Sequence, residues 1–283
     1  MKRVITFFLL ILFAMCNSVM AAQNREGGNM ARPETAKEEL SRWQGPKEDN
    51  LAVTDPEFSA IMNNLVYGEI LNKGTLTAPQ KSLIRLASLT ATQAWDEMED
   101  AVDAALRVGA TGLEIREALY QCAPYVGAPR VKKALSLANA RFKAASISLP
   151  MENAGTVTEA TRFRDGLAMQ KRIFGAENIE KMQKNAPANQ QPLITNYLSA
   201  WCFGDFYTRK ILDEKMRELI TFSAIVSLGG CNPQAQAHAQ ANLAVGNTPD
   251  DLLDALAVML PLIGYPRTLN GLGCVNAVLP KEK

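Results

Sequence analysis

The feature that most constrains how this chain can fold is an internal repeat. The segment EALYQCAPYVGAPR (117–130) aligns without a gap with DALAVMLPLIGYPR (254–267), at an offset of 137 residues. Further upstream, YGEILNKGTLTAPQKSLIRL (67–86) aligns with FGDFYTRKILDEKMRELITF (203–222) at an offset of 136 residues. A repeat of this length predicts two copies of one small folding unit.

Both copies carry the start signals and the periodicity of helices. Thr77 and Gln80 form a capping-box pattern in the first copy, and Asp213 is the matching N-cap candidate in the second. Apolar residues then recur at helical spacing, whereas the alternation typical of strands is absent. We therefore predict an all-α protein made of two tandem helical-bundle domains.

A stretch without apolar periodicity, SISLPMENAGTVT (146–158), separates the two copies and contains the Pro and Gly residues typical of a linker. We predict the following division of the chain: a signal peptide at 1–22, a polar N-terminal segment at 23–50, a first domain at 51–146, a linker at 147–160 and a second domain at 161–283. The first part of the polar segment, QNREGGNMARPET (23–35), is expected to be loose.

The N-terminus has the layout of a secretory signal peptide. Lys2 and Arg3 precede a short apolar run, and the small residues Ala21 and Ala22 offer a cleavage site. The run is too short to span a bilayer as a helix, so we expect no stable membrane insertion after cleavage. A lipoprotein is the weaker alternative, because Met15 fits poorly before a lipid-bearing cysteine. We predict a secreted or periplasmic protein.

Composition argues against several classes of partner. The 283 residues include 30 Lys and Arg against 29 Asp and Glu, so no basic excess predicts binding to nucleic acid. One histidine and five cysteines without a C-x-x-C pair do not supply the ligand spacing of a metal site, and no phosphate- or dinucleotide-binding motif occurs. We predict no metal and no cofactor. The expected partners are a small-molecule substrate and other copies of the chain.

The candidate site lies in GGCNPQAQAHAQ, which begins at Gly229 and holds the only histidine of the chain. The two glycines are expected to end a helix, with Asn232 as the N-cap of the next helix and Pro233 as its first residue. Cys231 then lies just before a helix N-terminus, whose partial positive charge stabilises a thiolate.

An acid and an imidazole are expected to meet near this thiol. His238 lies seven residues after Cys231, close to two helical turns, so we expect both side chains on one face. Glu218 belongs to the preceding helix, which packs antiparallel if the glycine turn is tight. We predict that Glu218 orients the His238 imidazole at about 3 Å, and that the imidazole transfers a proton to or from Cys231 or a substrate. The alternative is that the histidine fills the core and the cysteine acts as a small hydrophobic residue.

The first copy lacks all three of these residues, which favours one working site over a requirement of the fold. In place of Glu218, Cys231 and His238 it has Ser82, then Trp95 or Asp96, then Ala101 or Val102. Arg130 and Arg267, by contrast, occur at equivalent positions in both copies. We therefore assign these two arginines to the scaffold, as helix caps or interface residues.

The second copy resembles the carboxymuconolactone decarboxylase-like family, which includes the AhpD-type alkylhydroperoxidases, in LDEKMRELITF, GGCNPQAQAHAQ, VGNT and GYPRTLN. The first copy resembles it in YGEILNKGTLTAPQKSLIRLASL. The resemblance implies an AhpD-like helical bundle that assembles around a threefold axis, so a tandem chain is expected to form a homotrimer. In the decarboxylase branch, a histidine at the position of His238 is the acid–base residue for loss of carbon dioxide from a lactone acid.

The hydroperoxidase branch implies a different chemistry. Its C-x-x-C pair works with a Glu and a His, which correspond to the acid and the imidazole named above. The first cysteine of the pair matches Cys231, but the second falls on Gln234. A peroxidase of this kind would need Cys202, Cys274 or an external thiol to resolve a sulfenic acid.

Three functions remain open from the sequence. The first is a small-molecule lyase that decarboxylates a lactone or keto acid, with Glu218, Cys231 and His238 as its site. The second is thiol-dependent reduction of alkyl hydroperoxides, a peroxiredoxin activity with Cys231 as nucleophile. The third is a non-catalytic binding protein on the same fold. The missing second cysteine favours the lyase. No residue is assigned to substrate binding, and the aromatic segment WCFGDFY (201–207) fits either a pocket lining or the core.

Overall fold

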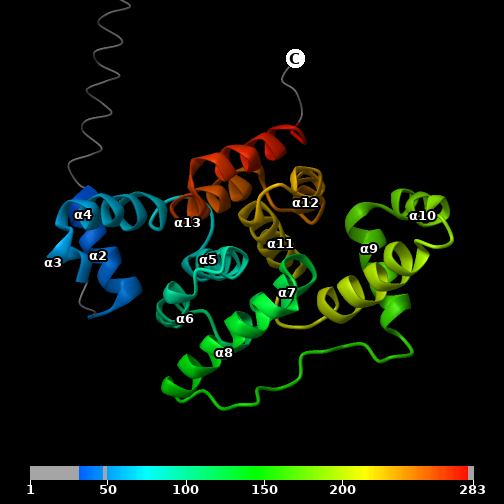
Figure 1. Ribbon diagram of the computed structural model, residues 1–283, viewed down its shortest axis with the longest axis horizontal. Coiled ribbons are helices and arrows are strands. Elements are labelled where there is room, and N and C mark those ends of the chain that lie inside the picture. Colours follow the sequence, from blue (N-terminus) through cyan, green and yellow to red (C-terminus); the bar gives the residue numbers. More distant parts are fainter. Residues whose placement is uncertain (1–31, 47–49, 280–283) are drawn as a thin grey trace, which may run out of the picture. The chain divides into compact units, whose positions relative to one another are not determined.

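The computed structural model describes residues 32–46 and 50–279. Within these ranges the chain is helical and has no strand, which confirms the predicted all-α class (Figure 1). The predicted signal peptide at 1–22 lies outside the described residues, and so does the first part of the polar segment predicted at 23–50.

Contacts group the chain into two compact units. Among the described residues, the first takes in 32–41 and 50–72, and the second takes in 42–46 and 73–279. The second unit therefore contains the main helices of both repeat copies. The domain bounds expected from the sequence stay predictions, because these units follow contacts and not the repeat.

The first unit consists of short helices. Its elements are α2 (Arg32–Gln44), whose last residues belong to the second unit, α3 (Asn50–Thr54), α4 (Pro56–Leu65) and the π-helical turn η1 (Val66–Ile70). Arg32 Nη1 lies 2.6 Å from Glu69 Oε1, and Ala36 is buried. The prediction of a loose stretch over 23–35 is therefore wrong from Arg32 onward, where α2 begins. It rested on polar composition, whereas the helix is held by tertiary contacts that composition does not reveal.

The second unit joins helices of both copies. In chain order its elements are α5 (Ala78–Thr92), the 3₁₀ turn η2 (Trp95–Glu97), α6 (Met98–Arg107), α7 (Gly112–Val126), α8 (Ala128–Ala144), α9 (Arg162–Phe174), α10 (Ala176–Asn185), the π-helical segment η3 (Pro192–Tyr207), α11 (Glu214–Leu228), α12 (Asn232–Ala244) and α13 (Pro249–Asn276).

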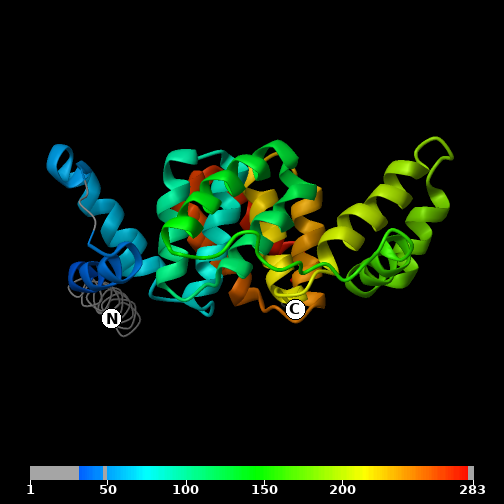
Figure 2. The ribbon, with the colours of Figure 1, turned by 90° about the horizontal axis from the view of Figure 1, so that it is seen from below.

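The centre of this unit is made by both repeats together. Helices α5 and α7 of the first copy pack against α11 and α13 of the second (Figures 1 and 2). Helix α11 lies against both α5 and α7, and α5 also lies against α13. Apolar side chains from all four helices are fully buried there, among them Ile84, Leu119, Phe222 and Val258. The two copies therefore share a continuous core, in which helices of the first copy lie directly against helices of the second.

The predicted helix starts are confirmed. Thr77 and Gln80 form the capping box of α5, with the Thr77 N–H donating to Gln80 Oε1 at 2.8 Å. Asp213 Oδ1 accepts from the Met216 N–H at 2.8 Å at the start of α11. These caps satisfy backbone groups that have no partner within the helix.

The two arginines shared by the repeats cap the C-terminal ends of equivalent helices. Arg130 Nη1 donates to Ala91 O at 2.7 Å at the end of α5, and Arg267 Nη1 donates to Ser227 O at 2.8 Å at the end of α11. The last carbonyls of a helix lack internal donors and favour a cation. The assignment of Arg130 and Arg267 to the scaffold is therefore confirmed.

Helices α9 and η3 cross at two glycines. A Cβ added at Gly166 would meet the backbone of Ser199, and one added at Gly204 would meet the backbone of Arg162. Arg162 also binds Asp205 across this crossing, with Nε 2.8 Å from Oδ1. The ends of α9 and η3 then pack with α12 in one apolar cluster, whose buried members are Ile173, Cys202, Phe203, Tyr207 and Ala241.

Within the described residues, α13 alone has the length and apolar composition of a membrane-spanning helix. Gly264, with a φ of +74°, kinks it at the G-Y-P-R motif, and α13 packs on α5, α11 and α12. One helix of this kind is weak evidence for a membrane span, because a core helix of a globular protein meets the same length and composition criteria.

Candidate active site

Glu218 enters the candidate site from the second turn of α11. Asp213 caps the start of this helix, and Gly229, with a φ of +74°, ends it as the glycine pair predicted. The Glu218 side chain has no exposed surface. A carboxylate in such a place requires donors from neighbouring elements, because an unpaired buried ion costs several kcal/mol.

The first of these donors is the only imidazole of the chain. His238 Nδ1, on α12, lies 2.7 Å from Glu218 Oε2. This confirms the predicted carboxylate–imidazole contact. When Glu218 is the acceptor of this hydrogen bond, Nδ1 is its donor and Nε2 is the ring nitrogen that takes no part in the contact. The His238 side chain keeps 10% of its surface exposed.

A pair of asparagines fixes the spacing of the two helices that carry the acid and the imidazole. Asn242 Nδ2 donates to Glu218 O at 3.1 Å and to His238 O at 2.7 Å. Asn247 Nδ2 in turn donates to Asn242 Oδ1 at 2.8 Å. The backbones of α11 and α12 are therefore bridged where the two functional side chains leave them.

The second oxygen of Glu218 is bound by a tyrosine that the sequence did not single out. The Tyr207 hydroxyl donates to Glu218 Oε1 at 2.7 Å and lies 3.0 Å from Thr221 Oγ1. Tyr207 is buried at the end of η3, whereas Trp201 in the same aromatic segment is exposed. The segment WCFGDFY therefore belongs mainly to the core, and its last residue joins the site.

Two aromatic rings flank the imidazole edge-on. The Tyr125 ring, from α7 of the first repeat, and the Phe174 ring, at the end of α9, each have their centroid 5.3 Å from that of His238. Such walls hold the ring and lower the local dielectric constant, which strengthens the hydrogen bond to Glu218.

The start of α12 differs by one residue from the prediction. Cys231 is the N-cap, while Asn232 and Pro233 are the first two helical residues, and no side chain caps the helix. Proline is tolerated there because the first N–H groups of a helix have no internal acceptor. The placement of Cys231 at a helix N-terminus is confirmed, and the assignment of Asn232 as N-cap is wrong.

Cys231 lines a hollow at the start of α12. This hollow is lined by residues of α11, α12 and α13 and of the turn between α11 and α12, namely Ile225, Val226, Gly229, Cys231, Asn232, Ala235, Arg267, Asn270 and Gly271. His238 is not part of that lining. As the N-cap, Cys231 has non-helical φ and ψ of −114° and 39°, so the helical spacing used to align it with His238 does not extend to it. The structure brings Glu218 and His238 together, and the inclusion of Cys231 in the site stays a prediction.

The other thiols of the described residues are free and buried, and no disulfide links them. Cys202 Sγ lies 3.6 Å from the Tyr125 hydroxyl, and Cys274 Sγ lies 3.4 Å from Asn232 O, next to Cys231 in the chain. Burial raises the pKa of the Cys202 thiol to about 12. In the described ranges, no group of three or more His, Cys, Asp or Glu side chains is placed to hold a metal ion.

The corresponding place in the first repeat holds no acid–imidazole pair. Ser82 Oγ donates to Pro79 O at 2.7 Å, within its own helix, and Ala101 and Val102 are buried apolar residues. The described structure therefore contains this dyad in the second repeat only.

A comparison of the repeats could have found the residues that sequence reasoning missed. Tyr207 aligns with Leu71 of the first copy, and Tyr125 aligns with Leu262 of the second. A polar group that replaces an aliphatic one at an otherwise equivalent core position indicates a local role. The contact partners themselves lie up to 100 residues apart, and no local pattern reveals them.

Comparison with known proteins agrees with the repeat. The family model described as carboxymuconolactone decarboxylase family matches residues 56–140 and 192–277. Among curated proteins, 4-carboxymuconolactone decarboxylase of Acinetobacter baylyi is 27% identical over 95 residues, which are 34% of this chain and 71% of that protein. The two matched regions correspond to the two repeats, and the second contains Glu218, Cys231 and His238.

A solved structure shares the fold over most of the chain. It is that of a Burkholderia xenovorans LB400 protein provisionally assigned as a gamma-carboxymuconolactone decarboxylase subunit. The similarity has a TM-score of 0.51 at 19% identity and covers 87% of this chain and 97% of that one. At this identity the match shows the fold alone.

Proposed function

Because the chain belongs to the carboxymuconolactone decarboxylase family, we propose that it is a small-molecule lyase in which His238, oriented by Glu218, transfers a proton during decarboxylation of a lactone or keto acid. The observation that carries the proposal is the 2.7 Å contact between His238 Nδ1 and Glu218 Oε2, which leaves Nε2 to exchange a proton with the substrate. A pair of this kind is a general acid–base unit with a fixed tautomer.

The proposed reaction requires one proton for each carbon dioxide released. The bond between the substrate carbon skeleton and its carboxylate breaks, carbon dioxide leaves, and the electron pair stays on the skeleton, delocalised toward the lactone or keto carbonyl. Protonated His238 donates its Nε2 proton to the carbanionic carbon and regains a proton from water. Glu218 stabilises the imidazolium that exists before this transfer.

The surroundings of His238 suit this chemistry. The rings of Tyr125 and Phe174 exclude water from two sides of the imidazole. A carbanionic intermediate is protected from unwanted protonation where bulk water is kept out. Both Glu218 oxygens and His238 Nδ1 take part in hydrogen bonds within the protein, so Nε2 is the atom of the dyad that we assign to proton transfer with the substrate.

Thiol-dependent reduction of alkyl hydroperoxides is the second candidate. It is favoured by the partial exposure of Cys231 and by its position as the N-cap of α12. It is disfavoured because Gln234 stands where the family's second cysteine would be, and because Cys202 and Cys274 are buried.

One set of variants separates the two functions. The purified protein is incubated either with 4-carboxymuconolactone, with carbon dioxide release as readout, or with an organic hydroperoxide and dithiothreitol, with peroxide consumption as readout. For the lyase we expect His238→Gln and Glu218→Gln to lower turnover by about 10²-fold or more, the scale of general acid–base catalysis. Cys231→Ser should keep most of the activity.

The opposite outcomes decide against the lyase. Full lactone turnover by His238→Gln would remove the imidazole from the mechanism. Peroxide consumption that disappears in Cys231→Ser, with no release of carbon dioxide by the wild type, would establish the peroxidase. A protein with neither activity on these probes, but with a bound small molecule, would be a binding module.

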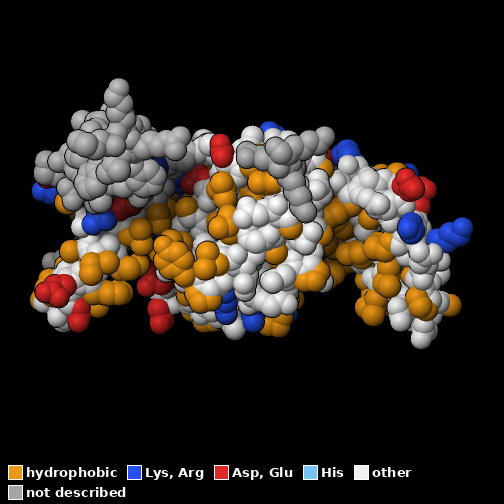
Figure 3. All heavy atoms as spheres, turned by 90° about the horizontal axis from the view of Figure 1, so that it is seen from above, with side chains coloured by type: hydrophobic (Ala, Val, Ile, Leu, Met, Phe, Trp, Pro, Cys, Tyr) orange, Lys and Arg blue, Asp and Glu red, His pale blue; other side chains and the backbone are white. Residues whose placement is uncertain are grey.

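We also propose that the chain assembles with copies of itself as a homotrimer. Hydrophobic side chains reach the surface of the part formed by α9, α10 and η3 (Figure 3), and Leu193, Tyr197 and Trp201 recur every four residues along η3 in exposed positions. Exposed apolar stripes of this kind are typical of interfaces. Light scattering should give a particle mass three times that of one chain, and a particle with the mass of one chain would contradict the proposal.

Export to a secreted or periplasmic location is likewise a proposal, supported by residues 1–22 alone.

A further inference from the structure

The dyad of the second repeat is contacted by polar side chains of the first. Gln121 and Tyr125, both on α7, reach the hydrogen-bond network of Glu218. At the equivalent positions the second repeat has Val258 and Leu262, which cannot donate or accept hydrogen bonds through their side chains. At these two positions, the first repeat, which has no dyad, provides polar side chains to the second, and the second provides none in return.

A continuous chain of hydrogen bonds starts at Arg217 and ends at Glu218. Arg217 Nη1 donates to Gln121 Oε1 at 2.9 Å, and Gln121 Nε2 donates to Thr221 Oγ1 at 3.1 Å. Thr221 Oγ1 lies 3.0 Å from the Tyr207 hydroxyl, which donates to Glu218 Oε1 at 2.7 Å. All five side chains are buried.

In this series of hydrogen bonds, each donor points toward the Glu218 carboxylate. Arg217 only donates, so the Gln121 amide must turn its oxygen to Arg217 and its NH₂ to Thr221. Tyr207 has one proton, which goes to Glu218 because an ionised carboxylate only accepts. The Tyr207 oxygen is then an acceptor for Thr221 and for the Tyr125 hydroxyl, 3.0 Å away. Hydrogen bonds aligned in one sense polarise and strengthen one another.

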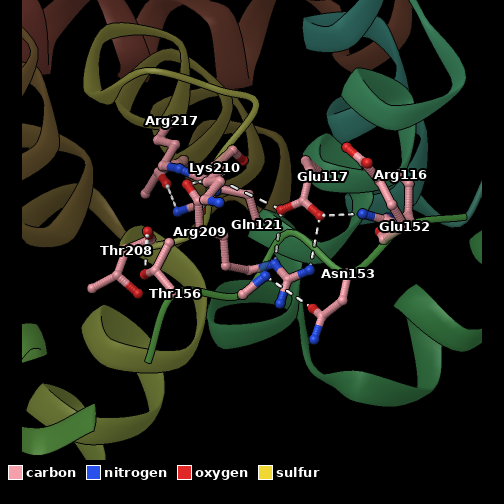
Figure 4. Close-up of polar contacts among 12 residues, drawn as sticks. Arg116, Glu117, Gln121, Glu152, Asn153, Thr156, Thr208, Arg209, Lys210 and Arg217 are labelled. Atoms are coloured by element: carbon pink, nitrogen blue, oxygen red, sulfur yellow. Dashed lines mark hydrogen bonds and ion pairs between the residues drawn. The ribbon is translucent and has the colours of Figure 1, made fainter. Parts of the chain in front are cut away.

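The Arg217 end of this series of hydrogen bonds is held by an ion cluster between the repeats. Glu117 of the first repeat binds Arg209 at 2.8 Å and Arg116 at 3.0 Å, and Arg217 lies 3.6 Å from it (Figure 4). Figure 4 shows Arg217 and Gln121 side by side at this cluster. The orientation of the Gln121 amide is thereby set by groups that have no contact with the imidazole.

The two phenols are suited to permanent donation. Burial, followed by the nearby Cys202 thiol and the Glu218 carboxylate, raises the pKa of Tyr125 well above its ordinary value. Burial and the Glu218 charge do the same to the pKa of Tyr207. Both hydroxyls therefore stay protonated across the range in which an imidazole changes charge.

We propose that the first repeat supplies Gln121 and Tyr125 as positioning residues that hold Tyr207 and, through it, the Glu218–His238 dyad. The inference rests on the proposed function for the catalytic role of that dyad, but not for the geometry. It assigns a role to the repeat that lacks a dyad: it provides one wall of the site and the donors behind it.

The test uses the fact that His238 is the only histidine of the chain. Protein labelled with ¹⁵N-histidine is studied by NMR at pH 9, well above the ordinary imidazole pKa of about 6.5. In the wild type we expect the proton on Nδ1. In Tyr125→Phe, which keeps the ring against His238, and in Gln121→Leu we expect the ratio of the Nδ1–H to the Nε2–H form to fall about three- to tenfold, the effect of weakening one hydrogen bond.

Two control variants make the result specific. Tyr207→Phe, which removes the direct donor, should show at least as large a change, and Tyr197→Phe, which removes an exposed hydroxyl on η3, should show none. A change in Tyr207→Phe together with wild-type spectra for Tyr125→Phe and Gln121→Leu would overturn the role of the first repeat. If Gln121→Leu does not fold, Tyr125→Phe decides alone.

Activity on 4-carboxymuconolactone separates this inference from the proposed function. If the lyase is correct, Tyr125→Phe should lower kcat with KM nearly unchanged, because a positioning residue acts on the reaction step. If no turnover is found for any variant while the NMR change occurs, the lyase fails and the positioning role stands. If turnover occurs and the NMR spectra do not respond, the positioning role is overturned and the lyase stands.

Discussion

Asp254 Oδ1 of the second repeat lies 3.2 Å from Lys81 Nζ of the first, and both side chains are buried. The contact between the equivalent positions of the repeat joins Arg217 of the second copy to Glu117 of the first at 3.6 Å. Lys81 and Arg217 are equivalent positions in the repeat, and so are Glu117 and Asp254. Each repeat thus places a buried cation beside an acid of the other, which makes the folding of the two copies interdependent.

Asp254→Asn should destabilise the whole second unit. The substitution leaves the Lys81 ammonium buried beside a neutral amide, and breaking a buried pair in this way costs about 3–5 kcal/mol. Urea unfolding measures the loss, and signals from both repeats should shift to lower midpoints together. Arg164→Gln, at an exposed pair with Asp165, is the matched control and should leave the midpoint unchanged. Independent transitions of the two repeats would contradict the interdependence.

Glu117 should make the protein sensitive to acid. Burial by itself raises the pKa of this carboxyl, but the hydrogen bond and charge of Arg209, with the charge of Arg217, hold it below its ordinary value of 4.5. A carboxyl with a lowered pKa in the folded state stabilises the fold above pH 4.5, and this contribution is lost as pH falls through the folded-state value. Wild type should therefore be more stable than Glu117→Gln at pH 7, by about 3 kcal/mol. The difference should shrink below pH 4.5 in urea titrations, and a constant difference would contradict this assignment.

The thiols should differ sharply in reactivity toward alkylating agents. Burial raises the pKa of Cys122 and of Cys202 to about 12, and it raises the pKa of Cys274. At pH 8 the thiolate fraction of a group with pKa about 12 is roughly one part in ten thousand. Iodoacetamide should therefore modify Cys231, which is partly exposed, well before Cys122, Cys202 and Cys274 in the folded protein. Peptide mass spectrometry checks this, and comparable early modification of Cys202 would show that its environment is open to solvent.

The shared arginines should contribute to stability and not to chemistry. Arg267→Met removes the donor to Ser227 O at the end of α11, and Arg130→Met removes the equivalent donor to Ala91 O at the end of α5. A hydrogen bond from a charged donor contributes about 1.5–3 kcal/mol, so each substitution should lower the thermal midpoint by several degrees. Arg130→Met lies in the repeat without a dyad and should leave turnover per folded molecule unchanged. A selective loss of turnover in Arg130→Met would assign it a role beyond capping.

Much of the architecture could be read from local patterns. The capping box at Thr77, the cap at Asp213 and the glycine at the end of α11 act within a few residues of themselves, so the sequence shows them directly. The error at Asn232 was of one residue, because a proline is accepted in the first turn wherever the cap falls. The helix that begins at Arg32 was missed because its ion pair with Glu69 lies far along the chain.

By itself, the sequence determined the all-α class, the duplication and the acid–imidazole pair, since helical spacing, aligned segments and a unique histidine are properties of nearby residues. Only the tertiary structure decided that Tyr207 and the first repeat's Gln121 and Tyr125 stand behind Glu218. The physical reason is that burial of a carboxylate must be balanced by donors, and these come from whichever helices the shared core brings within 3 Å or so, irrespective of their distance along the chain.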